Sequence, residues 1–241
     1  MPLPQISTPT YELTIPSSKK KIKYRPFLVR EEKILILALE SESENSIAEA
    51  IKSTLKSCII TRGVKIDSLS TFDIEYIFLN IRGKSVGESM DLIVTCPDDG
   101  KTKVEVKVYI DEIKVKTDEK HSPDIKLDDS LTLRMRYPAI NEFVRNNFEF
   151  KVNDEESIEQ SFDLIASCID VVYSNDESWA ASDCTKKELN EWLGTLNSKQ
   201  FKDIEMFFQT MPKLSHTIKV TNPNTKVESE VTLEGISNFF E

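Results

Sequence analysis

Glycine and histidine are both scarce in this sequence of 241 residues. It has six glycines, and no two of them have the spacing of a glycine-rich loop that binds a dinucleotide. The two histidines, His121 and His216, lie in no recognisable nucleophile motif. His121 belongs to a hydrophilic stretch, TDEKHSPD, where we expect a solvated side chain. The sequence therefore indicates a protein that is not an enzyme, with no catalytic residues, no cofactor and no small-molecule substrate.

Long apolar runs and excess positive charge are also missing. The longest apolar run, ILILAL, is far shorter than the ~20 residues that cross a bilayer, so we expect no membrane-spanning segment. The net charge of −10 argues against nucleic-acid binding, because that binding depends on Lys and Arg side chains. The N-terminus lacks a signal-peptide pattern, so we expect a reducing cytoplasm. The cysteines have no framework spacing and are therefore predicted to be free thiols: Cys58, Cys96, Cys168 and Cys184.

The spacing of apolar residues predicts a mixed α+β protein. Residues 11–27 alternate as a β-hairpin, and two similar ribbon-like hairpins follow, one inserted in mid-chain and one C-terminal. Between them lies a mainly helical body, because apolar residues recur there at helical spacing. The predicted helices cover residues 30–43, 45–60, 70–82, 138–147, 156–173, 186–196 and 199–211. Thr185 and Glu188 form a predicted capping box for the helix at 186–196, and Asn197 or Ser198 is expected to cap the last helix.

The order of these elements suggests three segments. Residues 1–89 hold the N-terminal hairpin and the first helices, and residues 90–137 form a β-insertion. Residues 138–241 form a helical region that ends in the last hairpin. One compact domain for the whole chain is the alternative.

The two later hairpins, at residues 90–113 and 216–236, share one pattern. Before and at the turn, matching residues are 126 positions apart, as in Pro97 and Pro223. After the turn the best match is 123 positions apart, as in Val104 and Val227. The second hairpin is therefore predicted to be three residues shorter, with the difference at the turn, because loops tolerate insertions that strands do not.

The first of these turns has half of a zinc knuckle. Cys96 precedes a Pro-containing turn, but the second cysteine that a knuckle needs is replaced by Asp99. A structural zinc site takes four Cys or His ligands, and these are not present, so we expect no bound metal. Because an isolated hairpin is only marginally stable, the hairpins are predicted to be held by packing or by a partner.

Three segments together resemble a known family. They are TYELTIPSSKKKIKYRPFLVREEKILILALES, FLNIRGKSVGESMDLIVTCPDDG and FFQTMPKLSHTIKV with VTLEGISNFF, in that order. They resemble the baseplate hub subunit and hub assembly proteins of T-even-like, contractile-tailed bacteriophages. Many members carry Cys-x-x-Cys pairs at the hairpin turns, whereas this chain keeps Cys96 and has Asn222 and Thr225 in the second turn. The resemblance thus implies ribbon-like hairpins that have lost their metal.

The resemblance implies a non-enzymatic tail baseplate protein, which assists assembly of the central hub by protein–protein interaction in the host cytoplasm. A permanent structural subunit of the hub in the virion is the alternative, and an enzyme or a host-directed adaptor are further classes. The expected partners are other phage baseplate hub or tail proteins. They would bind the hairpins' strand edges and apolar residues around Phe239 and Phe240, unless these two side chains close the protein's own core.

Overall fold

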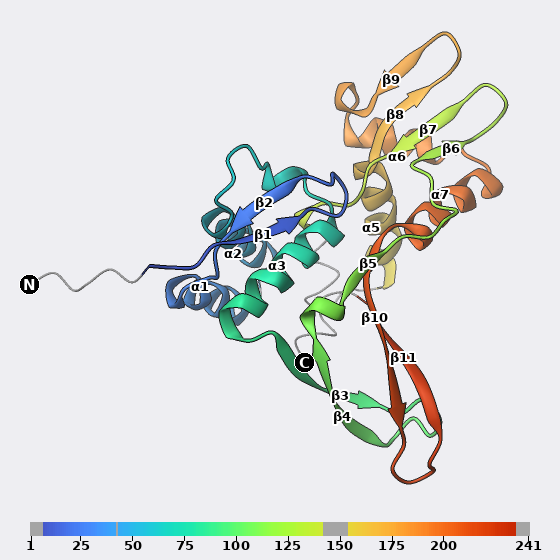
Figure 1. Ribbon diagram of the computed structural model, residues 1–241. Coiled ribbons are helices and arrows are strands. Elements are labelled where there is room, and N and C mark those ends of the chain that lie inside the picture. The colour runs from blue at the N-terminus through green and yellow to red at the C-terminus, as the bar shows by residue number, and fades with distance from the viewer. Residues whose placement is uncertain (1–6, 42, 142–153, 235–241) are drawn as a thin grey trace, which may run out of the picture. The chain divides into compact units, whose positions relative to one another are not determined.

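The computed structural model describes residues 7–41, 43–141 and 154–234, and the chain divides into two compact units (Figure 1). The first unit combines Met1–Lys116, Ala139–Phe148 and Lys213–Glu241. The second combines Thr117–Pro138 and Glu149–Pro212. Each unit is thus assembled from segments that are distant in the sequence.

The first unit begins with the predicted hairpin, in which β1 (Tyr11–Thr14) and β2 (Lys21–Tyr24) pair antiparallel. Its turn is fixed to the start of α3 (Thr71–Val86) by the buried carboxylate of Asp73. That carboxylate accepts hydrogen bonds from the backbone N–H and hydroxyl of Ser17 and from the hydroxyl of Ser70. Three donors thereby satisfy a carboxylate that would be costly to bury alone.

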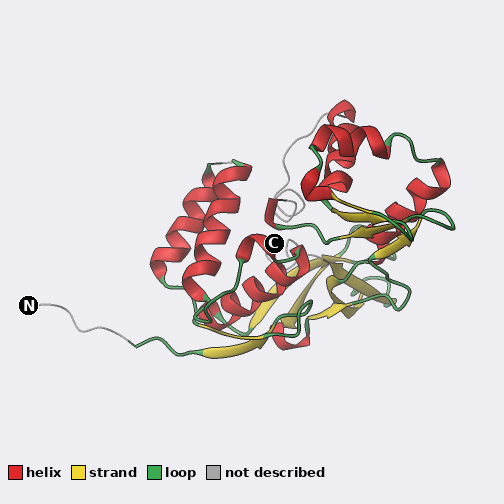
Figure 2. Cartoon of the chain, turned by 90° about the horizontal axis from the view of Figure 1, so that it is seen from above, coloured by secondary structure: helices red, strands yellow, loops and turns green. Residues whose placement is uncertain are grey.

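Three helices follow in the first unit, and two of them, α1 (Val29–Glu40) and α2 (Glu44–Cys58), lie side by side (Figure 2). Most of the predicted apolar stripe of α2 is buried, which confirms its amphipathic interpretation. On the predicted inward face of α3 three isoleucines are buried, and Phe78 is half-buried. The buried residues of these two stripes are Ile47, Ile51, Leu55 and Cys58 on α2, and Ile74, Ile77 and Ile81 on α3.

Two further antiparallel hairpins complete the described part of this unit. β3 (Ser89–Thr95) pairs with β4 (Lys103–Tyr109), and β10 (Lys213–Thr221) pairs with β11 (Glu228–Glu234). β5 (Lys114–Lys116) adds to β10, which gives a three-stranded sheet in the order β11-β10-β5. Along the hairpins alternate side chains are buried or half-buried, so each hairpin turns one apolar face inward. The turns of the two hairpins lie close together (Figure 1).

The second unit packs helices on one four-stranded antiparallel sheet in the order β6-β7-β8-β9. Its core includes Leu133, Ile169, Leu193, Ile204 and Phe207, which come from strands and helices alike. The elements of this unit are β6 (Asp124–Lys126), β7 (Thr132–Met135), α5 (Asp154–Ser167), β8 (Ile169–Tyr173), β9 (Ser178–Ala180), α6 (Lys186–Leu193) and α7 (Ser198–Thr210).

The structure confirms the α+β class. The described residues contain six α-helices and several small antiparallel sheets, including the hairpins β1-β2, β3-β4 and β10-β11. The predicted capping box of Thr185 and Glu188 is present at the start of α6. Of the two residues expected to cap α7, Asn197 is the N-cap. Most of the predicted helix at residues 138–147 lies outside the described residues.

One predicted helix, residues 156–173, is wrong at its C-terminal end. α5 ends at Ser167, and Ile169–Tyr173 forms the strand β8, which pairs with β7 on one side and β9 on the other. The segment IDVVY is rich in β-branched residues, which favour a strand with partners on both edges. Ile169 and Val172 match helical spacing, but they are buried as strand residues.

Candidate interaction sites

Helix α1 carries apolar side chains on the face that points away from the protein. Val29, Ile36 and Leu37 are 79%, 50% and 54% exposed, and we call these three residues the α1 patch. Val29 and Ile36 are seven residues apart and so share one face, whereas Glu31 and Ala38, also seven apart, are buried on the opposite face. Exposed apolar side chains gathered on one face of a helix are candidates for an interaction site. The patch is flanked by two more exposed apolar residues, Ile34 and Leu39.

The inner face of α1 is fixed by an ion-pair network at the start of the helix. The carboxylate of Glu31 accepts hydrogen bonds from Arg25 Nη2 at 2.9 Å, Arg30 Nε at 2.7 Å and the Leu28 backbone N–H at 2.8 Å. Burial alone would raise the pKa of Glu31, but these bonds outweigh it and lower the pKa to about 2. Arg25 also donates its backbone N–H to the carbonyl of Cys58, which ties this network to the end of α2.

The turns of the β3-β4 and β10-β11 hairpins have the same local geometry. In the first turn the N–H of Gly100 donates to the carbonyl of Cys96 at 3.0 Å, and in the second Lys226 donates to Asn222 at 2.9 Å. Gly100 and Lys226 both have left-handed backbone conformations, with φ of 63° and 64°. We refer to residues 96–100 and 222–226 as the two knuckle turns.

The second hairpin is one residue shorter than the first, and not three as predicted. Val94 pairs with Val104, while Val220 pairs with Ser229. Matching residues after the turn are therefore 229 − 104 = 125 positions apart. The predicted match of Val104 with Val227 was thus two residues out of register. A shift of two residues leaves every side chain on the same face, so the apolar alternation does not reveal it.

Hydrogen bonds join the two knuckle turns, and we call this set of contacts the clasp. Asn222 Nδ2 lies 3.0 and 3.1 Å from the two carboxylate oxygens of Asp98 and 3.0 Å from Oδ2 of Asp99. The hydroxyl of Thr225 also donates to Asp98. Asn224 Nδ2 donates to the hydroxyl of Thr102 at 3.1 Å. The clasp therefore holds the ends of two hairpins that are more than a hundred residues apart in the chain.

Electrostatics favour the ionised form of both carboxylates in the clasp. Hydrogen bonds from Thr225 and then Asn222 lower the pKa of Asp98. Hydrogen bonds from the side chain and backbone of Thr102 lower the pKa of Asp99. Burial, and next the charges of Asp98 and Asp99, raise the pKa of the Cys96 thiol. The thiol therefore stays protonated beside two anionic carboxylates.

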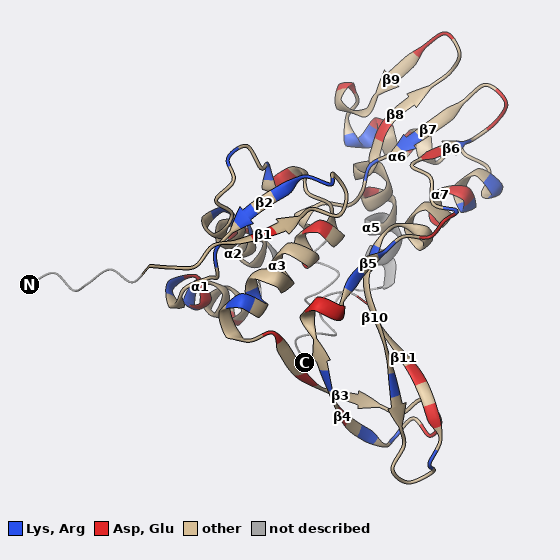
Figure 3. Cartoon of the chain, in the orientation of Figure 1, with Lys and Arg blue, Asp and Glu red and all other residues tan. Residues whose placement is uncertain are grey.

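The outer strand β11 presents a negatively charged edge (Figure 3). Glu228, Glu230 and Glu234 are exposed along it. Charged side chains on an edge strand oppose pairing with another strand. A partner that adds a strand here, as the sequence analysis expects of the hairpin edges, would meet these glutamates, whose charge is partly offset by ion pairs with Lys213 and Lys219 of β10.

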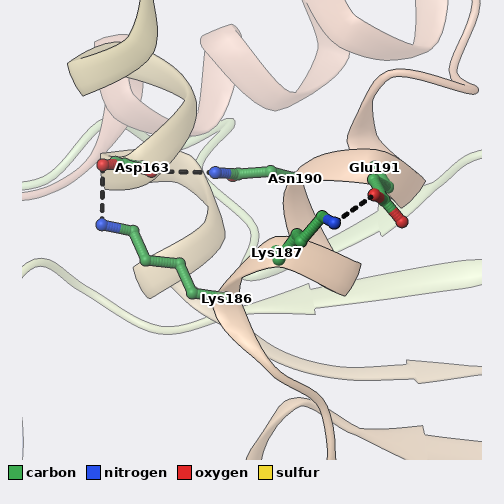
Figure 4. Close-up of a pocket in the computed structure, with 5 residues that line it drawn as sticks. All are labelled: Asp163, Lys186, Lys187, Asn190 and Glu191. Carbon is green, nitrogen blue, oxygen red and sulfur yellow. Dashed lines mark hydrogen bonds and ion pairs between the residues drawn. The ribbon is translucent and has the colours of Figure 1, made fainter.

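In the second unit, a hollow of about 600 Å³ is lined by charged and polar side chains of α5 and α6 (Figure 4). Lys186 Nζ lies 2.6 Å from Asp163 Oδ2, and Asn190 Nδ2 donates to Asp163 Oδ1 at 2.8 Å. Lys187 and Glu191 form a second ion pair at 3.7 Å. These groups neutralise one another, so the arrangement favours a structural link between the helices over a binding site.

His121 is not the solvated side chain that the sequence predicts. Its ring packs against Tyr137 and Phe207, and its nitrogens lie 3.1 Å from Thr210 Oγ1 and 2.9 Å from Tyr137 Oη. Burial lowers the pKa of His121, so the ring is neutral at pH 7. The hydrophilic neighbours of His121 in the sequence hide this packing, because its contacts come from residues distant in the chain.

The other candidate residues fall in different places. Phe239 and Phe240 lie outside the described residues. Cys58, Cys96 and Cys168 are buried thiols, and Cys184 is exposed. Within the described ranges no three His, Cys, Asp or Glu side chains are grouped so that they could hold a metal. Sequence reasoning missed the α1 patch, although the unbroken run ILILAL, apolar on every face of a helix, was a signal for it.

Comparison with known proteins identifies the family. A family model described as T4 bacteriophage base plate protein matches residues 8–241. The chain belongs to this family. No curated protein sequence and no solved structure matched the chain.

As a member of the T4 bacteriophage base plate protein family, the chain is a phage base plate protein, and its partners include other phage tail proteins. None of the helices in the described ranges is both long and apolar enough to cross a membrane. For a base plate protein, the α1 patch and the joined hairpins are the features that bear on contacts with other tail proteins.

Proposed function

We propose that this protein assists assembly of the central base plate hub through protein–protein interaction and catalyses no reaction. The observation that carries the proposal is the α1 patch, three exposed apolar side chains on a helix of a base plate protein. The assembly takes place in the host cytoplasm, where the tail proteins meet.

The α1 patch fits a partner that receives a helix in an apolar groove. In that mode of recognition, anchor side chains recur along one helical face, as Val29, Ile36 and Leu37 do. Full burial of one such side chain contributes about 1.5–3 kcal/mol, so three of them supply enough for a specific contact. The intervening Lys33 and neighbouring Glu32 are exposed and suit the polar rim of an interface.

The inner face of α1 supports this role because it is rigidly held. Glu31 is 3% exposed and bonded to two arginines, so the helix start is fixed before a partner arrives. A preformed helix loses less conformational entropy on binding than a flexible segment. The α1 patch is therefore presented in a defined orientation on its unit.

A permanent structural subunit of the hub in the virion is the second candidate. The family match to base plate proteins supports it, because a base plate protein can act by remaining in the particle. The two roles differ in where the protein is found at the end of assembly.

The test has two steps. The chain is first co-expressed with the other base plate proteins of its phage, and we expect at least one of them to co-purify. Mass spectrometry of complexes from infected cells and of finished particles then separates the roles. Peptides in the complexes but not in the particles support the assembly role. Peptides in the particles at base plate copy number support the permanent subunit. Failure to bind any tail protein in either setting contradicts both.

A further inference from the structure

The clasp joins the two knuckle turns at positions that correspond between them. Cys96 and Asp99 occupy the first and fourth positions of one turn, and Asn222 and Thr225 occupy the same positions of the other. A pair of ligands separated by two residues on each of two turns is the arrangement of a structural zinc site. The matching backbone hydrogen bonds and the matching left-handed residues show that the likeness extends to the backbone.

The centre of the clasp is occupied by a side-chain amide. Asn222 is 1% exposed, and its Nδ2 lies within 3.1 Å of three carboxylate oxygens of the facing turn. Its Oδ1 accepts from the backbone N–H groups of Asn224 and Thr225, which fixes the amide nitrogen toward the carboxylates. A donor group surrounded by anionic oxygens takes the place that a cation has in a metal site.

We infer that the knuckle turns are a metal-site scaffold in which the Asn222 amide and its hydrogen bonds replace the ion. Cysteines at positions 99, 222 and 225, together with the existing Cys96, would then complete a four-thiolate zinc site. The native clasp closes the hairpins without any metal supply. This inference does not depend on the proposed role in hub assembly.

The position of Cys96 supports its assignment as the fourth ligand. Cys96 is 1% exposed at the start of its turn, and its backbone N–H donates to the Thr102 carbonyl at 2.8 Å, which closes the base of the turn.

The main experiment compares two triple variants in a Cys184→Ser background, which removes the exposed thiol. The first is Asp99→Cys with Asn222→Cys and Thr225→Cys. The matched control is Asp98→Cys with Pro223→Cys and Asn224→Cys, which adds as many thiols to the same turns at positions that do not correspond to ligands. Zinc content is measured after dialysis, and Co²⁺ is added as a spectroscopic probe of coordination geometry.

The inference predicts one zinc per chain in the first variant, a tetrahedral cobalt–thiolate spectrum, and binding at least tenfold tighter than in the control. The native chain should retain no stoichiometric zinc, and a chelator should leave its melting temperature unchanged. A folded first variant without zinc overturns the inference. Equal binding by the two variants also overturns it, because thiols alone would then explain the metal.

A single substitution keeps the inference testable if the triple variants do not fold. Asn222→Asp places a third carboxylate against Asp98 and Asp99, so the melting temperature should fall. Added Zn²⁺ should then restore it toward the native value by occupying the centre of the clasp. Asn224→Asp is the control, because its amide donates to Thr102 rather than to the carboxylates. No recovery with Zn²⁺, or equal recovery in the control, overturns the inference.

Discussion

Replacement of Glu31 by glutamine should destabilise the first unit strongly. Glu31 is 3% exposed and receives charged hydrogen bonds from Arg25 and Arg30. Glutamine keeps the shape of the side chain but removes the charge, which leaves the guanidinium of Arg25 without its ionic partner. The side chain of Arg25 is only 14% exposed, so water replaces that partner poorly.

The size of the effect follows from the pKa. The fall in the Glu31 pKa from 4.5 to about 2 corresponds to about 3 kcal/mol of preference for the charged form in the folded state. Removal of one partner from a buried ion pair typically costs about 3–5 kcal/mol, which agrees with this value. We therefore expect Glu31→Gln to lower the free energy of unfolding by about 3 kcal/mol at pH 7.

Urea unfolding followed by circular dichroism measures this loss, with Glu32→Gln as the matched control. Glu32 is the next residue of the same helix and is exposed, so its replacement should change stability by less than about 0.5 kcal/mol. Because the folded pKa of Glu31 is lowered, its contribution is present above about pH 4.5 and is lost as the pH falls to about 2. The difference between native protein and Glu31→Gln should shrink over that range. Equal unfolding midpoints of Glu31→Gln and Glu32→Gln at pH 7 would refute the reasoning.

Three further predictions concern other parts of the protein. Asp73→Ala removes the acceptor that holds Ser17, so hydrogen exchange should become faster in the β1-β2 hairpin while the second unit keeps its protection; unchanged exchange in the hairpin would contradict this. Cys184 alone should react with a thiol reagent in the folded protein, because the other three cysteines are buried, and a count of more than one reactive thiol before unfolding would be the opposite result. Lys226→Gly should raise the free energy of unfolding by roughly 1 kcal/mol in a urea titration, since glycine adopts a φ of 64° without strain. Lys219→Gly, in the middle of β10, should instead lower it.

Local features of the sequence were sufficient to predict much of the fold. The stripes of α2 and α3 and the caps at Thr185 and Asn197 depend on residues within one or two helical turns, so they are readable without tertiary information. The hairpins were predicted for the same reason. Strand alternation and Pro-containing turns are properties of short segments.

The errors arose where distant contacts decide the structure. Ile169–Tyr173 continues the helical spacing of α5, but pairing with a strand on each side favours the strand β8 over a helix. Matching residues after the two turns were predicted to be 123 positions apart, whereas they are 125 positions apart. Side-chain alternation repeats every two residues, so it cannot separate these two offsets, and only the pairing of the strands does. His121 was predicted from its polar neighbours in sequence, although its environment is set by Tyr137, Phe207 and Thr210.

The candidate sites were predictable only in part. The knuckle pattern at Cys96 and the likeness of the two hairpins could be seen in the sequence, but the bonds from Asn222 to Asp98 and Asp99 join residues more than a hundred positions apart. Prediction of the α1 patch would have required knowing which face of α1 packs against the rest of its unit. The prediction for Phe239 and Phe240 stays a prediction, since both lie outside the described residues.

The most direct test of the account measures whether the α1 patch binds a base plate partner. The native protein, a Val29→Gln and Ile36→Gln double variant, and an Ile93→Gln control are each co-expressed with the partner that the native chain retains. Ile93 is 69% exposed on the strand β3, so the control removes an exposed apolar side chain that does not belong to helix α1. The account predicts that the control binds like the native protein, and that the double variant folds normally but binds at least about 30-fold more weakly, as expected for loss of about 2 kcal/mol at anchor residues. Native affinity in the double variant would contradict the claim that the protein acts through this surface.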